Sequence, residues 1–198
     1  MLRNQLSNMI IEAIDLGKKY GKNWIFRHLN FRIEPGSKIA ITGKNGSGKS
    51  TLLQIISGYL TPSQGKVSYD DQDDPESCNI AYVGPYLELV EEFTLLEFLV
   101  FHSKFRVPNV QFEEMAQKAS LPLDQLIGDF STGMKQRVKL MTAFFFENDL
   151  IFFDEPTSNL DDEGFQWWNE ELEKLSSTVL IASNQISEIK TCEKSISL

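Results

Sequence analysis

The nine residues Gly43 to Thr51, GKNGSGKST, constrain the fold of this chain more than any other segment. They match the pattern GxxxxGK[ST], follow the short apolar run Lys38–Thr42 and precede the helical pattern of residues 50–60. Glycines let successive backbone N–H groups turn inward, and the N-terminus of the following helix adds a positive end. The sequence therefore predicts a phosphate-binding loop between a buried strand and a helix.

Two side chains of this loop have specific chemistry toward a nucleoside triphosphate. We expect the Lys49 ammonium to reach the β- and γ-phosphates, and the Ser50 hydroxyl to bind Mg²⁺. ATP and Mg²⁺ are thus the expected cofactors. The residues expected to contact the nucleotide here are Gly43, Asn45, Gly46, Ser47, Gly48, Lys49, Ser50 and Thr51.

A second apolar strand ends in two carboxylates, in the run LIFFDE of residues 150–155. The carboxyl ends of parallel strands face the usual ligand crevice of an α/β sheet. Asp154 is expected to bind Mg²⁺, directly or through another ligand of the ion. Glu155 is placed to orient or deprotonate the water that attacks the γ-phosphate.

Hydrophobic periodicity gives strands alternating with helices, which predicts an α/β fold with a largely parallel central sheet. A turn is expected at residues 18–23, and the block of residues 86–146 is mostly helical, which is typical of an inserted subdomain. The expected strands are 9–16, 25–33, 38–42, 66–69, 150–153 and, as the last, 178–182. The expected helices are 50–60, 94–106, 112–119, 131–146 and 162–175.

Length and charge narrow the class of protein. A chain of 198 residues fits a single domain, and its net charge of −9 argues against general nucleic-acid binding. No signal segment or bilayer-length apolar run is evident, so we expect a cytoplasmic protein that reaches the membrane only through a partner. The acidic run of residues 70–77 lacks the ligand spacing of a calcium loop and is expected to be a solvated loop.

Three further segments accompany the phosphate loop and the acidic pair. Residues 130–137 read FSTGMKQR, residues 158–161 read SNLD, and Tyr20 precedes the phosphate loop. In this order the segments resemble the signature, the D-loop and the adenine-stacking aromatic of ABC-type ATPases. The resemblance implies a P-loop NTPase fold over residues 1–198, with an antiparallel β subdomain at the N-terminal side and an inserted helical subdomain at about residues 86–146.

The resemblance also implies a mechanism. Two ATP-binding subunits, identical or different, are expected to close head-to-tail on two ATP molecules and to drive a transmembrane permease. Ser131 and Gly133 would then contact the γ-phosphate bound by the opposite subunit, with Asp161 of the D-loop nearby and Tyr20 stacked on adenine. The alternative is a soluble ATPase switch or regulator with slow or no hydrolysis and no transport role.

Two positions depart from the family pattern. A glutamine that contacts Mg²⁺ is expected where Pro85 stands, and proline offers neither a side-chain ligand nor an N–H. A histidine that donates to the γ-phosphate is expected where Asn184 stands. An amide also donates, but with shorter reach and no cationic form. We therefore expect ATP hydrolysis to persist but to be slow.

Overall fold

The computed structural model describes residues 9–70 and 78–198, so the acidic run expected at residues 70–77 lies almost wholly outside the described residues. The chain forms two compact units. We call them the sheet unit (Met1–Tyr82, Asp149–Asp154 and Ser176–Leu198) and the helical unit (Val83–Asn148 and Glu155–Leu175).

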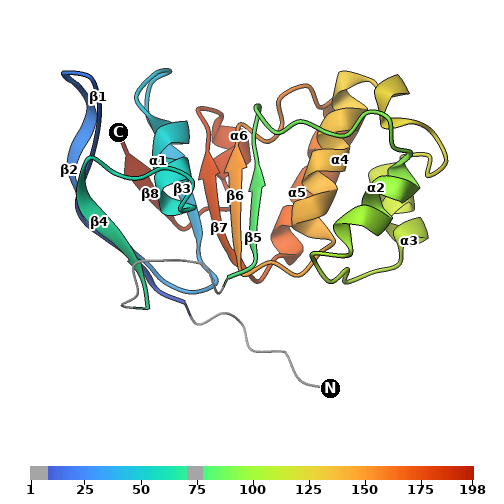
Figure 1. The fold of residues 1–198 in the computed structure, drawn as a ribbon, viewed down its shortest axis with the longest axis horizontal. Coiled ribbons are helices and arrows are strands. Elements are labelled where there is room, and N and C mark those ends of the chain that lie inside the picture. Colours follow the sequence, from blue (N-terminus) through green and yellow to red (C-terminus); the bar gives the residue numbers. More distant parts are fainter. Residues whose placement is uncertain (1–8, 71–77) are drawn as a thin grey trace. The chain divides into compact units, whose positions relative to one another are not determined.

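The sheet unit holds two sheets (Figure 1). One is antiparallel, in the order β2-β1-β4, and the other has five strands in the order β5-β6-β7-β3-β8. In the second sheet β3 is parallel to β7 and β8, and β6 is parallel to β7. The α/β class, the parallel central sheet and the N-terminal antiparallel sheet are confirmed. The strands are β1 Ile11–Tyr20, β2 Asn23–Ile33, β3 Lys38–Thr42, β4 Gln64–Tyr69, β5 Ile80–Val83, β6 Leu150–Asp154, β7 Thr178–Ala182 and β8 Lys194–Ser197.

Helix α1 (Lys49–Ile56) packs against β6 and β7 and carries the phosphate loop at its N-terminus. Leu52 and Leu53 of this helix are fully buried, in one core cluster with Ile41, Phe152 and Leu180 from the strands. This core fixes the ends of β3, β6 and β7, where the predicted site residues lie. A short helix, α6 (Ile186–Ile189), follows β7.

The helical unit contains α2 (Leu95–His102), α3 (Phe112–Ala119), α4 (Thr132–Phe144) and α5 (Asp162–Lys174). A capping box between Thr94 and Glu97 begins α2, where each side chain accepts from the backbone N–H of the other residue. Helix α4 packs against α3 and α5. The ring of Phe144 meets that of Trp167 edge-on, with centroids 5.5 Å apart.

Several sequence-based boundaries were wrong, and one is the end of the helix expected at residues 94–106, which ends at His102. The expected helix 50–60 ends at Ile56, because Gly58 takes a left-handed φ of 77°. The expected helix 131–146 ends at Phe144, where Asn148 Nδ2 donates to the carbonyl oxygens of Thr142, Ala143 and Phe146.

Another wrong boundary concerns the turn expected at residues 18–23. Only Gly21 and Lys22 form it, with Gly21 at a φ of 59°, so Tyr20 is the last residue of strand β1.

Strands β5 and β8 were not among the strands expected from periodicity, and β8 follows β7, which the sequence had indicated as the last strand. Its residues KSIS carry only one apolar side chain, and the strand pairs in parallel at the edge of the sheet, beside β3. No helix among residues 9–70 and 78–198 is long and apolar enough to cross a membrane.

Candidate nucleotide-binding site

The phosphate loop runs from the end of β3 to the start of α1, and its backbone conformation requires glycine. Gly48 has a φ of 102°, and a Cβ there would lie 2.3 Å from Ile25 Cγ2. Gly43 has a φ of 151°, and its Cβ would lie 2.5 Å from Ser47 Oγ. Such close approaches exclude a side chain. The loop is therefore a tight backbone cradle, as the motif predicts.

Lys49 is held over this cradle. Its side chain is 6% exposed, and Nζ donates to the carbonyl oxygens of Gly43 at 3.1 Å and of Lys44 at 3.4 Å. A buried ammonium whose partners are neutral carbonyls is suited to an anion, since phosphate oxygens form stronger, charge-assisted hydrogen bonds. The geometry agrees with the predicted contact to phosphate.

Ser50 and Asp154, predicted from segments far apart in the sequence, meet in the structure. Ser50 Oγ donates to Asp154 Oδ1 at 3.0 Å, and Asp154 is 2% exposed at the end of β6. Mg²⁺ is commonly bound by one or two carboxylates together with substrate phosphates and waters. The described residues contain no group of three or more His, Cys, Asp or Glu for a metal held by protein alone. The pair thus fits an Mg²⁺ that arrives with a nucleotide.

A third residue of this cluster was not among the predicted site residues. Tyr82 Oη, from strand β5, donates to Asp154 Oδ2 at 3.2 Å. The sequence gives no signal for this contact, because β5 and β6 become neighbours only in the folded sheet.

Asn184 lies two residues after β7, and its side chain reaches the phosphate loop. Its Nδ2 donates to Oδ1 of Asn45. Both side chains are exposed. The amide at position 184 is therefore close enough to the loop to act as a donor there, and it is engaged by Asn45 in this structure.

Tyr20 ends β1 and is 53% exposed, and the Lys18 ammonium lies 5.3 Å from its ring centroid. An exposed aromatic face of this kind can stack on a purine base. Adenine stacking by Tyr20 stays a prediction. Pro85 lies in the exposed loop after β5, and its place at the position where the family has a glutamine also stays a prediction.

The remaining candidates belong to the helical unit. Ser131 Oγ accepts the N–H of Met134 at 3.2 Å and so caps α4, as predicted for an anion-binding helix N-terminus. Gly133 lies against the D-loop, since a Cβ there would be 2.8 Å from the carbonyl oxygen of Asn159. The signature and D-loop segments thus pack directly on each other.

The carboxylate of Asp161 has two partners within the helical unit. Oδ1 accepts the N–H of Gly164 at 2.8 Å and Nη2 of Arg137 at 2.7 Å. The Gly164 N–H and then Arg137 lower the pKa of this carboxyl below its ordinary value. The side chain predicted to lie near nucleotide therefore caps helix α5 and holds Arg137 of helix α4.

Glu155 follows Asp154 directly and is exposed, with a φ of 50°. A non-glycine residue in the left-handed region is uncommon, and such conformations cluster at functional sites. The next residue is fixed to helix α4, because Gln136 Nε2 donates to the carbonyl oxygen of Pro156 at 2.7 Å. The structure thus holds the backbone after Glu155 firmly and leaves its carboxylate exposed.

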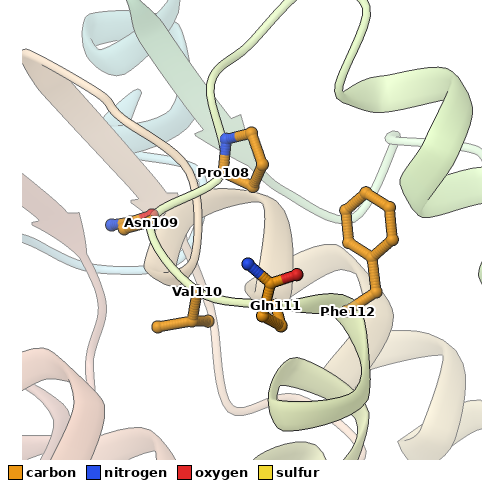
Figure 2. Close-up of a pocket in the computed structure, with 5 residues that line it drawn as sticks. All are labelled: Pro108, Asn109, Val110, Gln111 and Phe112. Carbon is orange, nitrogen blue, oxygen red and sulfur yellow. The ribbon is translucent and has the colours of Figure 1, made fainter.

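A hollow of about 120 Å³ in the helical unit lies at the loop before α3 (Figure 2). It contains none of the predicted site residues. Its lining residues are Pro108, Asn109, Val110, Gln111 and Phe112.

Comparisons to known proteins show the family to which the chain belongs. The ABC transporter family profile matches residues 26–158. The chain therefore belongs to the ABC transporter family, among its ATP-binding proteins. It is similar to the cytochrome c biogenesis ATP-binding export protein CcmA of Pseudomonas aeruginosa, with 30% identity over 93% of this chain and 97% of that protein.

Other known proteins are similar to part of this sequence or have a similar fold. The ribose import ATP-binding protein RbsA of Bacillus subtilis is 31% identical over 78% of this chain and 35% of its own length. A solved structure of an ATP-binding subunit of an ABC transporter is 26% identical, with a TM-score of 0.84 over 96% of this chain and 85% of that chain. The dimeric bacterial cassette MJ0796 has the same fold, at 24% identity, with a TM-score of 0.81 over 95% of this chain and 94% of that chain.

Proposed function

We propose that this chain is the ATP-hydrolysing subunit of a membrane transporter, and that two such subunits close head-to-tail around ATP to drive a separate transmembrane partner. The observation that carries the proposal is the contact between Ser50 and Asp154 beside the buried Lys49. A glycine cradle, a cation and an oxygen pair for Mg²⁺ are the parts that phosphoryl transfer requires.

Each residue has a role in this mechanism. Backbone N–H groups of the loop and Lys49 bind the phosphates, and Ser50 with Asp154 holds Mg²⁺. When bound, Mg²⁺ neutralises charge on the β- and γ-phosphates. Glu155 orients or deprotonates the attacking water, and its exposed carboxylate is available for that contact. Tyr20 stacks on the adenine.

Hydrolysis by this site is slow. A neutral amide at Asn184 donates to the γ-phosphate with shorter reach than a histidine ring, and Pro85 offers Mg²⁺ no side-chain ligand. A lengthened or lost donor in the transition state costs roughly 2–4 kcal/mol, which is about two to three decades in rate. The hydrogen bond from Asn184 to Asn45 must also break before the Asn184 amide can donate to the γ-phosphate of an entering nucleotide.

The second subunit completes the site. Ser131 caps α4, so the N–H groups of the first turn and the helix dipole favour an anion at that end. In the proposed dimer this anion is the γ-phosphate of the ATP on the opposite subunit, with Gly133 close to it. Asp161 supports the arrangement through Arg137 of α4.

The transmembrane partner is proposed from the relatives and from one exposed segment. The named relatives are ATP-binding proteins of export and import systems. In the helical unit, Tyr86 is 84% exposed and Val90 is 42% exposed. Apolar side chains exposed close together mark interaction sites. We assign this segment to the partner and place the subunit on the inner face of the membrane.

The test has two steps: a search of the neighbouring genes for one that encodes a multi-helix membrane protein, and co-expression with that protein followed by purification and a steady-state ATPase assay. We expect both chains to co-purify from membranes and to hydrolyse ATP. Lys49→Ala and Glu155→Gln should abolish turnover, and Lys190→Ala, which removes an exposed ammonium, should not. Recovery of soluble chain alone, or full turnover by Glu155→Gln, contradicts the proposal.

A further inference from the structure

The Asp154 carboxylate accepts a hydroxyl on each of its two oxygens. Ser50 Oγ donates to Oδ1 at 3.0 Å, and Tyr82 Oη donates to Oδ2 at 3.2 Å. Asp154 is 2% exposed, and both donors are half-buried protein hydroxyls. Two donors on opposite oxygens fix the rotation of the carboxylate plane.

The ring of Tyr82 is held in place independently of its hydroxyl. It stacks on Phe152 of β6 at a centroid distance of 6.3 Å and an interplanar angle of 25°. A second ring neighbour is Tyr59, with centroids 6.5 Å apart. Phe152 and Asp154 point to the same face of β6, because side chains alternate along a strand. The contact of Tyr82 with Phe152 thus directs the hydroxyl toward Asp154.

We infer that Tyr82 is a positioning residue for the Mg²⁺ site: its hydroxyl orients Asp154 so that the carboxylate meets Mg²⁺ while Oδ1 stays with Ser50. The inference rests on the proposed function, in which Ser50 and Asp154 hold the Mg²⁺ of bound ATP. Residues that orient metal ligands change metal affinity without touching the metal.

This role gives the segment before Pro85 a contact with the metal site. Tyr82 lies three residues before Pro85. Pro85 occupies the position where the glutamine ligand was expected. Proline cannot supply a donor or a ligand, whereas the Tyr82 hydroxyl acts on the metal-binding carboxylate itself. The segment therefore acts on Mg²⁺ through Asp154 rather than by direct ligation.

Tyr82→Phe removes the hydroxyl and keeps the ring that packs on Phe152. Tyr59→Phe is the matched control, because it removes the same group from the neighbouring ring, which is 86% exposed. Mn²⁺ is the probe, titrated into protein with the β,γ-imido analogue of ATP, and free Mn²⁺ is measured by electron paramagnetic resonance. Binding of the analogue alone is measured in EDTA by calorimetry.

Loss of a hydrogen bond to a charged group should weaken Mn²⁺ binding about 10-fold in Tyr82→Phe. Binding of the analogue in EDTA should stay at the wild-type level, and Tyr59→Phe should match wild type in both titrations. In the ATPase assay, the KM for Mg²⁺ should rise while the KM for ATP at saturating Mg²⁺ stays constant.

Three results overturn the inference. Unchanged Mn²⁺ affinity in Tyr82→Phe shows that the hydroxyl does not act on the metal site. An equal loss of analogue binding in EDTA shows that Tyr82 supports the fold of the site rather than the metal. Failure of the wild-type protein to bind Mn²⁺ with the analogue contradicts the proposed function itself.

Discussion

Replacing Asn184 tests how much an amide contributes at the position that we propose lies beside the γ-phosphate. In the structure its Nδ2 donates to Asn45 Oδ1, so the side chain already reaches the phosphate loop. We expect this donor to move to a γ-phosphate oxygen when ATP binds. Asn184→Ala removes the donor, and Asn184→His supplies a ring N–H with longer reach.

The magnitude follows from the type of bond. A hydrogen bond to a charged acceptor contributes about 1.5–3 kcal/mol, and each 1.4 kcal/mol changes a rate about tenfold. Asn184→Ala should therefore lower kcat by about 10- to 100-fold, with little change in the KM for ATP. Asn184→His should raise kcat by about one to two decades.

The assay is steady-state phosphate release by the purified complex at saturating Mg²⁺ and ATP, with thermal melting to compare the folding of each variant. Asn45→Ala tests the contact between Asn45 and Asn184 apart from the donor itself. It removes the acceptor of the hydrogen bond seen in the structure and leaves the Asn184 amide in place. Equal kcat values for wild type, Asn184→Ala and Asn184→His would refute the reasoning.

Two other substitutions test the geometry of each unit. Gly48→Ala should lower the free energy of unfolding by more than about 1–2 kcal/mol, because a Cβ at a φ of 102° meets Ile25. Differential scanning calorimetry should show a lower melting temperature for this variant. Adding ATP should not shift that melting temperature. Asp161→Asn tests the lowered pKa of Asp161: its ionised form contributes stability above the unfolded-state pKa of about 3.9, and this contribution is lost as the pH falls through the lower folded value. Urea unfolding should therefore show wild type more stable than Asp161→Asn at pH 7 and the two converging in acid, whereas a constant difference down to pH 2 contradicts the assignment.

The features that could be predicted from the sequence are those specified locally. The loop from Gly43 to Ser50 combines a motif with a flanking strand and helix, and the structure places it between β3 and α1. Ser131 precedes an apolar helix and caps it, as its residue type favours. Ser50 meets Asp154 because the phosphate loop follows β3 and Asp154 ends β6, at the carboxyl ends of strands in one parallel sheet, and Ser50 lies in the first turn of α1, directly after the loop.

The features that were missed depend on neighbours far away in the chain. Strand β8 is short and mostly polar, and it forms because β3 offers a free edge. The end of α4 at Phe144 is the exception, because Asn148 donates to carbonyl oxygens only two to six residues earlier in the chain. Tyr82 reads as an ordinary strand residue until β5 lies beside β6. The contact between Asn184 and Asn45 likewise requires the folded sheet.

The central claim, that ATP closes two copies through Ser131, is tested most directly by sedimentation velocity of Glu155→Gln, in which hydrolysis is blocked. With Mg²⁺ and ATP the protein should sediment as a dimer, and with ADP as a monomer. Adding Ser131→Asp should abolish the dimer, because aspartate still caps α4 but repels the γ-phosphate of the opposite subunit. A monomer at every ATP concentration, or a dimer that Ser131→Asp leaves intact, would contradict the account.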